Sequence, residues 1–285
     1  MPIENARRFD RTTEDVGNIV KLEHVNVIMP DQRLATLFYI SALGLTRDPY
    51  LMTGVDNMWV NAGENQFHLP TGEPQRFRGT IGLVVADLPA LVARLRAVEP
   101  LLRGTQFSFE AHDAFVDTTC PWGNRIRCHA PDAARFGTRT LGMPYVEVDV
   151  APGTATGIAS FYRDMMAAPA RVEKGTAIVT AGARQWLRFR ETDAAIAPYD
   201  GHHIQVYIAD FSGPYERLRA RGLVSMETDE HEYRFIRIAD ARDSTLCALE
   251  HEVRSMRHPL YGRPLVNRNP AQSNRAYVPG RDAFA

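Results

Sequence analysis

Histidines and carboxylates stand near the start of several short, alternating stretches of this 285-residue chain. In an extended strand, successive side chains point to opposite faces of the sheet. In HVNVIMPD, YVEVDVAP and HIQVYIAD one set of alternate residues is apolar. The other set is polar and titratable, and comprises His24 and Asn26; Tyr145, Glu147 and Asp149; and His203, Gln205 and Tyr207. A sheet with one apolar and one titratable face predicts a cup that holds a ligand or a metal ion, although a solvated outer face gives the same pattern.

Shorter alternating stretches extend the same polar face. His68, His129 and Glu250 alternate with apolar neighbours, and so do Arg188 and Arg190. A guanidinium pairs with a carboxylate through two parallel hydrogen bonds. The two arginines are therefore candidates for binding a substrate carboxylate, with a solvated strand face as the alternative.

Four copies of one pattern must position these side chains. The strands that begin at residues 24, 80, 145 and 203 are each followed by an amphipathic helical pattern and then by shorter alternating runs. Asp31, Asp87 and Asp210 follow three of the strands, where a helix N-cap would accept backbone N–H groups. A strand, a helix and further strands, repeated four times, predict an α+β chain of tandem βαβββ modules.

Composition excludes several classes of protein. Lysine and arginine total 33 against 34 acids, so the chain has no basic excess for a nucleic acid backbone. No run approaches the ~20 apolar residues of a membrane span, and the first residues do not resemble a signal peptide. The three cysteines lack metal-binding spacing, which indicates reduced thiols in a cytoplasmic protein.

Four longer segments carry a family resemblance. They are EHVNVIMPDQRLATLFYISALGL, DTTCPWGNRIRCHAP, YVEVDVAPGTATGIASFYRDMM and GHHIQVYIADFSGPYERLRARGL. Together they resemble the vicinal oxygen chelate superfamily, which includes glyoxalase I, bleomycin-resistance proteins and extradiol dioxygenases. The resemblance implies four βαβββ modules paired into two glyoxalase/bleomycin resistance/dioxygenase-type domains, at residues 21–135 (modules one and two) and 142–254 (modules three and four). Residues 1–20 are then an N-terminal arm and 255–285 an extended tail.

The resemblance also implies metal ligands at the start of a module's first strand and on its last strand. In the second domain these positions are His203, Glu250 and either Tyr145 or Glu147. The first domain offers a second-choice site of His24, His68 and His129. Histidine and carboxylate donors with open positions suit Fe(II) or Mn(II). The alternative is that His203 hydrogen-bonds within the core and Glu250 pairs with an arginine, and no metal is bound.

The resemblance further suggests catalytic roles for His231 and Tyr233, in the stretch where extradiol enzymes place groups that handle dioxygen. Arg188, Arg190, Gln205 and Tyr207 are the expected substrate-binding residues. The implied function is a metal-dependent extradiol-type dioxygenase acting on a small aromatic or vicinal-oxygen substrate. A glyoxalase-like isomerase or lyase and a metal-free small-molecule binding protein are the alternatives.

The tail contains apolar residues that a free arm would leave in water: Leu260, Tyr261, Leu265 and Val266. We therefore expect it to close the cup or to clasp a second subunit of a homodimer or higher oligomer.

Overall fold

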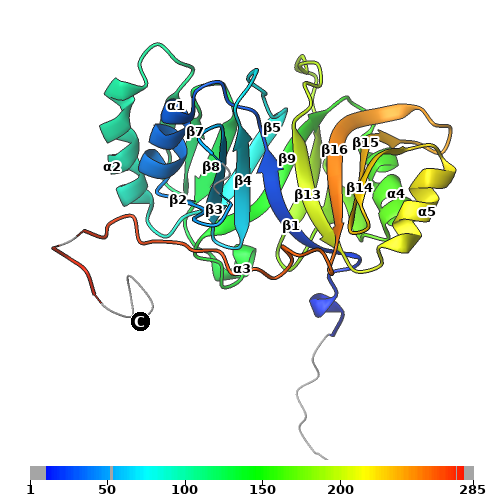
Figure 1. Cartoon of the computed structure of the whole chain (residues 1–285). Coiled ribbons are helices and arrows are strands. Elements are labelled where there is room, and N and C mark those ends of the chain that lie inside the picture. The colour runs from blue at the N-terminus through cyan, green and yellow to red at the C-terminus, as the bar shows by residue number, and fades with distance from the viewer. Residues whose placement is uncertain (1–10, 52–53, 274, 279–285) are drawn as a thin grey trace, which may run out of the picture.

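The computed structural model describes residues 11–51, 54–273 and 275–278, and it confirms four βαβββ modules in tandem (Figure 1). Module one consists of β1 (Ile19–Asn26), α1 (Gln32–Ala35) with the π-helical turn η2 (Thr36–Ala42), β2 (Thr46–Arg47), β3 (Asn57–Ala62) and β4 (Asn65–Pro70). Module two consists of β5 (Gly79–Val84), α2 (Leu88–Val98) with the 3₁₀ turn η3 (Glu99–Leu101), β6 (Ser108–Ala111), β7 (Phe115–Thr119) and β8 (Arg125–His129).

Modules three and four repeat the order. Module three consists of β9 (Gly142–Val150), α4 (Ala155–Met166), β10 (Ala170–Glu173), β11 (Thr176–Thr180) and β12 (Trp186–Glu191). Module four consists of β13 (His203–Ile208), α5 (Ser212–Ala220), β14 (Val224–Asp229), β15 (Glu232–Ala239) and β16 (Thr245–Ser255). The 3₁₀ turn η1 (Arg11–Glu14) precedes β1, and the short helix α3 (Ala133–Phe136) connects modules two and three.

Local chemistry explains where the helices begin. The Asp31 carboxylate accepts a hydrogen bond from the backbone N–H of Leu34, and the Asp87 carboxylate accepts one from Ala90. These bonds satisfy N–H groups that the first helical turn leaves without partners, so the predicted N-caps at α1 and α2 are confirmed. Asp210 accepts from the backbone N–H of Gly213 in the first turn of α5.

The sheet topology differs from the expected pairing of consecutive modules. One sheet has the order β14-β15-β16-β13-β1-β4-β3-β2, and the other has β10-β11-β12-β9-β5-β8-β7-β6. Module one therefore shares a sheet with module four, and module two with module three. We expected the ranges 21–135 and 142–254 to build one sheet each, and they do not. The reason is that β1 pairs antiparallel with β13, a contact between distant segments that periodicity within one segment does not encode.

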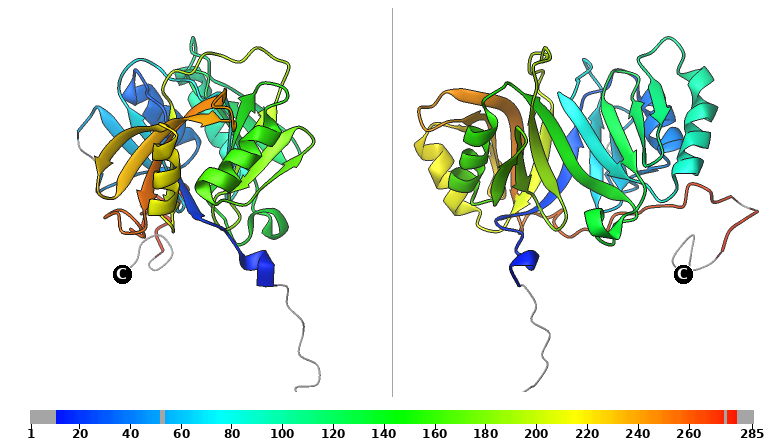
Figure 2. Two further views of the ribbon diagram at one scale, coloured as in Figure 1. Left: turned by 90° about the vertical axis from the view of Figure 1, so that its right-hand side faces the viewer. Right: turned by 180° about the vertical axis from the view of Figure 1, so that it is seen from behind.

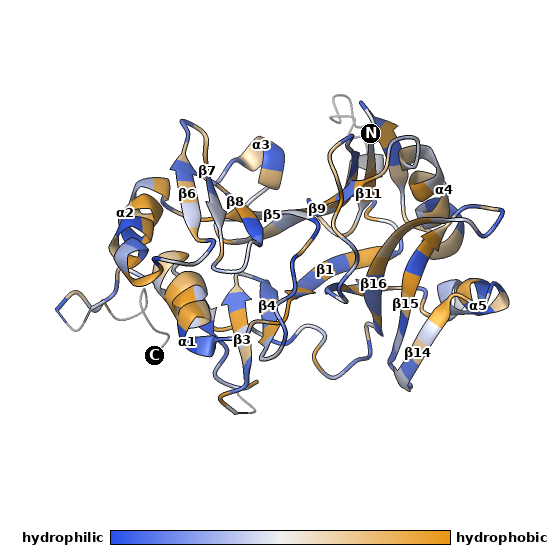
Figure 3. Ribbon diagram, turned by 90° about the horizontal axis from the view of Figure 1, so that it is seen from above, coloured by the Kyte–Doolittle hydropathy of each residue, from blue (hydrophilic) through white to orange (hydrophobic). Residues whose placement is uncertain are grey.

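The two sheets turn their apolar faces toward one core that the helices complete. From above, one sheet runs along each side, while α1 and α2 lie at one end and α4 and α5 at the other (Figure 3). The other views show the same two groups of helices (Figure 2), and α2 packs on η2 as α4 packs on α5. Helix α4 buries Ile158, Phe161 and Tyr162 at helical spacing. No helix in the described ranges is both long and apolar enough to span a membrane.

Candidate metal centre

Three imidazoles converge in the middle of the first sheet. His24 lies on β1, His68 on the neighbouring strand β4, and His203 on β13 on the other side of β1. The sheet register explains the convergence, because Asn26 of β1 lies opposite both His68 and His203. One nitrogen from each ring lies within 4.8 Å of the other two. This spacing is short enough for one ion to be bound by all three rings.

Two of these imidazoles carry buried nitrogens that lack a hydrogen-bond partner among the described residues. His24 is fully buried, and its Nε2 has no hydrogen-bond partner. His203 is also buried, and its Nε2 likewise has no hydrogen-bond partner. Buried polar atoms in native proteins are nearly always hydrogen-bonded, so two such nitrogens in one cluster require an explanation. A divalent metal ion would accept both lone pairs, and the donor set therefore fits a metal.

A second layer of polar groups orients the rings. Nδ1 of His24 donates to the Glu23 carboxylate at 2.7 Å, and Nε2 of His68 donates to Oδ1 of Asn57 at 2.8 Å. Each bond occupies one ring nitrogen and leaves the other available to a metal. Trp59 stacks on His68, with ring centroids 3.9 Å apart, and meets His24 edge-on. The rings are thus held in place before any ion is bound.

A register shift in β1 explains how the adjacent residues Glu23 and His24 meet. Leu22 pairs with Val206 of β13, but His24 pairs with Gln205, so Glu23 is an extra residue between them. Such a β-bulge breaks the strict alternation of side chains. The Glu23 carboxylate consequently reaches the ring of its neighbour instead of pointing away from it.

Electrostatics keeps the cluster in the form that binds metals. Burial, followed by the charges of His24 and His203, lowers the pKa of His68 to about 2. Burial also lowers the pKa of His203, against the opposing effect of Glu252. Neutral imidazole is the form that ligates a metal, so these rings need not lose a proton to bind one at neutral pH.

Glu252 on β16 is the carboxylate that lies nearest to the ring of His203, with Oε2 3.4 Å from Nε2. Arg234 and Arg254 each place a guanidinium nitrogen 2.5 Å from this carboxylate. Burial opposes its ionisation, but the adjacent His203 ring and the charges of His24, Arg254 and Arg234 lower the pKa of Glu252. Glu250, the predicted ligand, lies 3.7 Å from Nδ1 of His203 and accepts a hydrogen bond from Arg234 at 2.7 Å.

The remaining predicted ligands lie in the second sheet, away from the three-histidine cluster. Nε2 of His129 on β8 lies 3.0 Å from the hydroxyl of Tyr145 on β9, and Glu147 pairs with Arg188 and Arg190. The residues assigned to the two expected metal sites are therefore grouped differently in the structure. His203 joins His24 and His68, because module four shares its sheet with module one.

The expected substrate-binding residues also lie in two different sheets. Gln205 and Tyr207 lie on β13 beside the cluster, and both amide atoms of the fully buried Gln205 lack a described partner. Tyr207 contacts Arg254, and burial raises its pKa to about 12. Arg188 and Arg190 lie on β12 of the other sheet. Their proposed contact with the same substrate is therefore not supported.

The expected catalytic residues are not brought to the cluster. Tyr233 lies on the helix-covered face of β15, where its ring packs against Phe211 and Tyr215. His231 precedes β15 in the turn, and its ring pairs with Glu230 at 3.2 Å. We expected His231 and Tyr233 to share a strand face. They do not, because β15 begins at Glu232 and His231 lies outside the strand.

The C-terminal tail covers one border of the first sheet, where it runs beneath β1, β4 and β3 (Figure 1). Arg263 forms an ion pair at 2.8 Å with Asp48, which is fully buried and accepts a hydrogen bond from Gln66. Tyr261 packs edge-on against Tyr207. Sequence reasoning missed Glu23, Asp48 and Arg263 because each reaches the site through a bulge or through a contact between distant segments.

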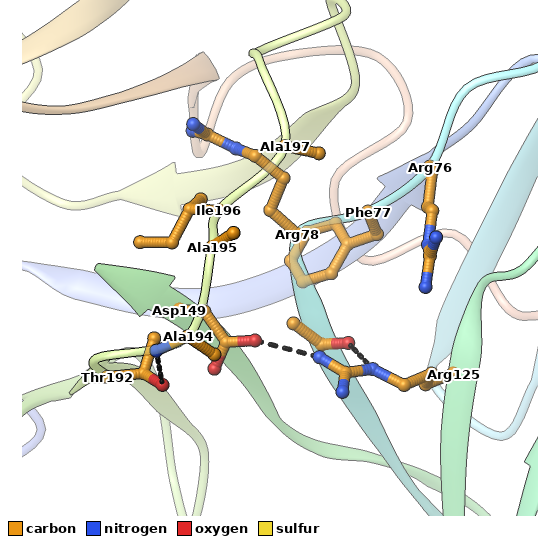
Figure 4. Close-up of a pocket in the computed structure, with 11 residues that line it drawn as sticks. Arg76, Phe77, Arg78, Arg125, Asp149, Thr192, Ala194, Ala195, Ile196 and Ala197 are labelled. Atoms are coloured by element: carbon orange, nitrogen blue, oxygen red, sulfur yellow. Dashed lines mark hydrogen bonds and ion pairs between the residues drawn. The ribbon is translucent and has the colours of Figure 1, made fainter. Parts of the chain in front are cut away.

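A different pocket lies between the second sheet and the connecting segments 76–78 and 192–197 (Figure 4). Its volume is about 190 Å³, and its lining includes Arg76, Arg78, Arg125 and Asp149. The Asp149 carboxylate is already bound by Arg125 at 2.8 Å. The pocket is smaller than the ~300–1,000 Å³ of typical ligand sites and contains none of the clustered histidines. It is therefore a poor candidate for the functional site.

The fold matches known structures although the sequence does not match known families. No family model and no curated protein sequence matches the chain. A protein from Bacillus subtilis subsp. subtilis str. 168, named as a candidate dioxygenase, superposes with a TM-score of 0.56 at 12% identity, covering 87% of this chain and 92% of that one. Glyoxalase I from Zea mays superposes with a TM-score of 0.55 at 10% identity, covering 82% and 92%. The chain therefore has the same fold as these two proteins.

Proposed function

We propose that this protein is a metal-dependent dioxygenase of the extradiol type that acts on a small substrate with two vicinal oxygens. The observation that carries the proposal is the cluster of His24, His68 and His203, with two buried ring nitrogens that lack partners. Imidazole donors with an adjacent carboxylate suit Fe(II) or Mn(II). Bound there, such an ion would supply a Lewis acid for two substrate oxygens and a redox centre for dioxygen chemistry.

The number of protein donors supports a reaction with more than one exogenous ligand. Glu252 is held by two arginines, whereas each of the three histidines directs one ring nitrogen into the cluster. An ion held by only these three protein groups would leave positions open for a chelating substrate and for dioxygen.

The chain's own residues would exclude water and orient the substrate. His24 and Gln205 are fully buried and therefore shielded from solvent, and the Trp59 ring stacks on His68. The unpartnered amide of Gln205 is available to a substrate oxygen or hydroxyl. A dry site of this kind strengthens the electrostatic interactions inside it.

A glyoxalase-like isomerase is the second candidate, because Glu252 lies close enough to His203 to become a fourth donor. An isomerase also needs a general base whose pKa lies near the working pH. The ion pairs of Glu252 and the hydrogen bond of Glu23 instead lower the pKa of each carboxylate, which weakens both as bases. These shifts favour the dioxygenase.

Oxygen uptake tests the proposal. Protein loaded anaerobically with Fe(II) or Mn(II) is mixed with a panel of catechols and 2-oxoacids in an oxygen electrode. We expect stoichiometric oxygen consumption with at least one catechol, and we expect His68→Ala to abolish it. His129→Ala removes a buried histidine from the other sheet and should leave uptake unchanged.

Two results would overturn the dioxygenase assignment. Isomerisation of an α-hydroxycarbonyl compound without oxygen consumption would establish the second candidate. Absence of bound metal after loading would favour a metal-free binding protein.

A further inference from the structure

The second sheet carries arginines where the first carries metal-binding groups. In the first sheet, β4 and β16 flank the central pair of strands and supply His68 and Glu252. In the second sheet the flanking strands are β8 and β12, and their polar face carries Arg125, Arg127, Arg188 and Arg190. Guanidinium groups do not ligate metals, but they are the preferred partners of carboxylates and phosphates. The same architecture therefore presents guanidinium groups on this side, and these four are paired with carboxylates of the chain.

A pocket of about 540 Å³ opens on this face between β9, β12 and α3. This volume is within the range of small-molecule sites. Three aromatic rings line it, from Tyr145, Trp186 and the buried Phe136, and Ile178 adds an aliphatic surface. The pocket thus offers flat apolar walls as well as charge.

Positive charge dominates the rim of this pocket. Four arginines line it, at positions 135, 171, 184 and 188, against the single acid Glu173. Arg171 pairs with Glu173 at 2.5 Å, and Arg188 lies 3.3 Å from Glu147. Within the described ranges, Arg135 and Arg184 form no ion pair with a carboxylate. Two guanidiniums are therefore available to an anion.

The aromatic walls are arranged in contact with these cations. Arg188 lies over the ring of Tyr145 and Arg135 over the ring of Phe136, with distances of 5.3 and 4.6 Å to the ring centroids. Gly82 lies beneath Tyr145, because a Cβ there would meet the tyrosine ring at 2.4 Å. Glycine at this position lets the tyrosine ring lie against the sheet as a wall of the pocket.

Arg184 occupies its place at a conformational cost. Its φ of +53° lies in the left-handed region, which favours glycine or asparagine over a long side chain. Its guanidinium makes only a long hydrogen bond, of 3.4 Å, to the backbone carbonyl of Ala134. Arg184 thus presents a charge at the rim of the pocket from a backbone position that favours a smaller residue.

We propose that this pocket binds a small aromatic carboxylate, with its ring between Tyr145 and Trp186 and its carboxylate bound by Arg135 and Arg184. Stacking on aromatic faces and bidentate pairing with guanidinium are complementary to the two halves of such a ligand. The site is distinct from the three-histidine cluster, which lies in the other sheet, and it does not depend on the dioxygenase assignment.

Benzoate and phthalate are the probes for the test, with benzyl alcohol and benzylamine as neutral and cationic analogues. Binding to the full-length protein is followed by calorimetry and by quenching of tryptophan fluorescence. We expect saturable binding of the carboxylates only. Arg135→Gln and Arg184→Gln should each weaken it at least about tenfold, as expected for a lost charge-assisted hydrogen bond. Trp186→Phe should remove the quenching but retain the heat of binding.

Three sets of control variants establish whether the carboxylate binds at this pocket. Arg96→Gln removes an exposed arginine of α2 and should leave affinity unchanged. Arg184→Gly should weaken binding while maintaining or raising the melting temperature, because glycine relieves the left-handed strain. His203→Ala and His68→Ala should bind benzoate normally. The proposal is overturned if no carboxylate binds, if Arg96→Gln has the same effect as Arg184→Gln, or if the histidine variants abolish binding.

Discussion

The carboxylate of Glu23 lies 2.7 Å from Nδ1 of His24, the residue that follows it in the chain. Adjacent residues of a regular strand point to opposite faces, so this contact exists because of the register shift between Leu22 and His24. It makes Glu23 the group that orients the His24 ring, a candidate metal ligand whose other nitrogen has no partner among the described residues.

Glu23→Gln should weaken metal binding without removing a ligand. The amide cannot supply the negative charge that orients the His24 ring, and loss of such partners typically lowers metal affinity about 10–100-fold. Competition with a chromogenic chelator measures the change. Glu147→Gln, a carboxylate of the second sheet, is the matched control. Equal affinities of Glu23→Gln and the unmodified protein would show that the contact is only structural.

His203→Ala should abolish metal binding. We expect about one divalent ion per chain in the unmodified protein and a large loss in the variant, because one of three converging donors is removed. Elemental analysis of protein purified without chelators measures both. His129→Ala should retain the ion, since His129 lies with Tyr145 in the other sheet. Full retention in His203→Ala would exclude the three-histidine site.

Shortening the chain after Met256 should destabilise the protein. Arg263 is the cationic partner of the fully buried Asp48, and removing one member of a buried ion pair typically costs about 3–5 kcal/mol. Thermal unfolding should therefore shift to lower temperature. A chain that ends after Arg268 keeps Arg263 and should be affected less. An unchanged melting curve for the shorter chain would show that the tail does not stabilise the fold.

A double-mutant cycle isolates the ion pair within the tail. Arg263→Gln alone should destabilise the protein because it leaves the Asp48 carboxylate buried without its cation. Adding Asp48→Asn should recover part of that loss. Additive effects of the two substitutions in urea unfolding would contradict a direct interaction.

His251 should make the protein less stable in acid. This fully buried ring hydrogen-bonds with the hydroxyl of Tyr162 at 2.6 Å, and burial lowers its pKa to about 4. The unfolded chain binds a proton near pH 6.5, whereas the folded protein does so only near pH 4. The free energy of unfolding therefore falls by up to about 1.4 kcal/mol per pH unit as the pH decreases through this interval.

Urea unfolding in the presence of a chelator, between about pH 7 and pH 4.5, tests the assignment to His251. His251→Gln cannot be protonated in this range and should flatten the dependence by about the contribution of one group. His112→Gln, at a half-exposed position, controls for the loss of an imidazole elsewhere. The assignment fails if His251→Gln retains the full slope.

The sequence by itself determined the modules and the chemical character of their faces. Alternation at a period of two placed His24, His68 and His203 on polar strand faces, and Asp31 and Asp87 marked helix starts that the structure confirms. These features depend on residues a few positions apart, so a short window of sequence contains the information. The family resemblance and the fold follow from the same local patterns.

Only the tertiary structure decided which histidines meet. The sequence assigned His203 to one site and His24 with His68 to another, because consecutive modules were expected to pair. The pairing of β1 with β13 joins distant strands through backbone hydrogen bonds and side-chain packing that no local pattern specifies. The bulge at Glu23 and the contact of Arg263 with Asp48 have the same origin. Both depend on the partner strand or segment, and for that reason the composition of the candidate site became visible only in three dimensions.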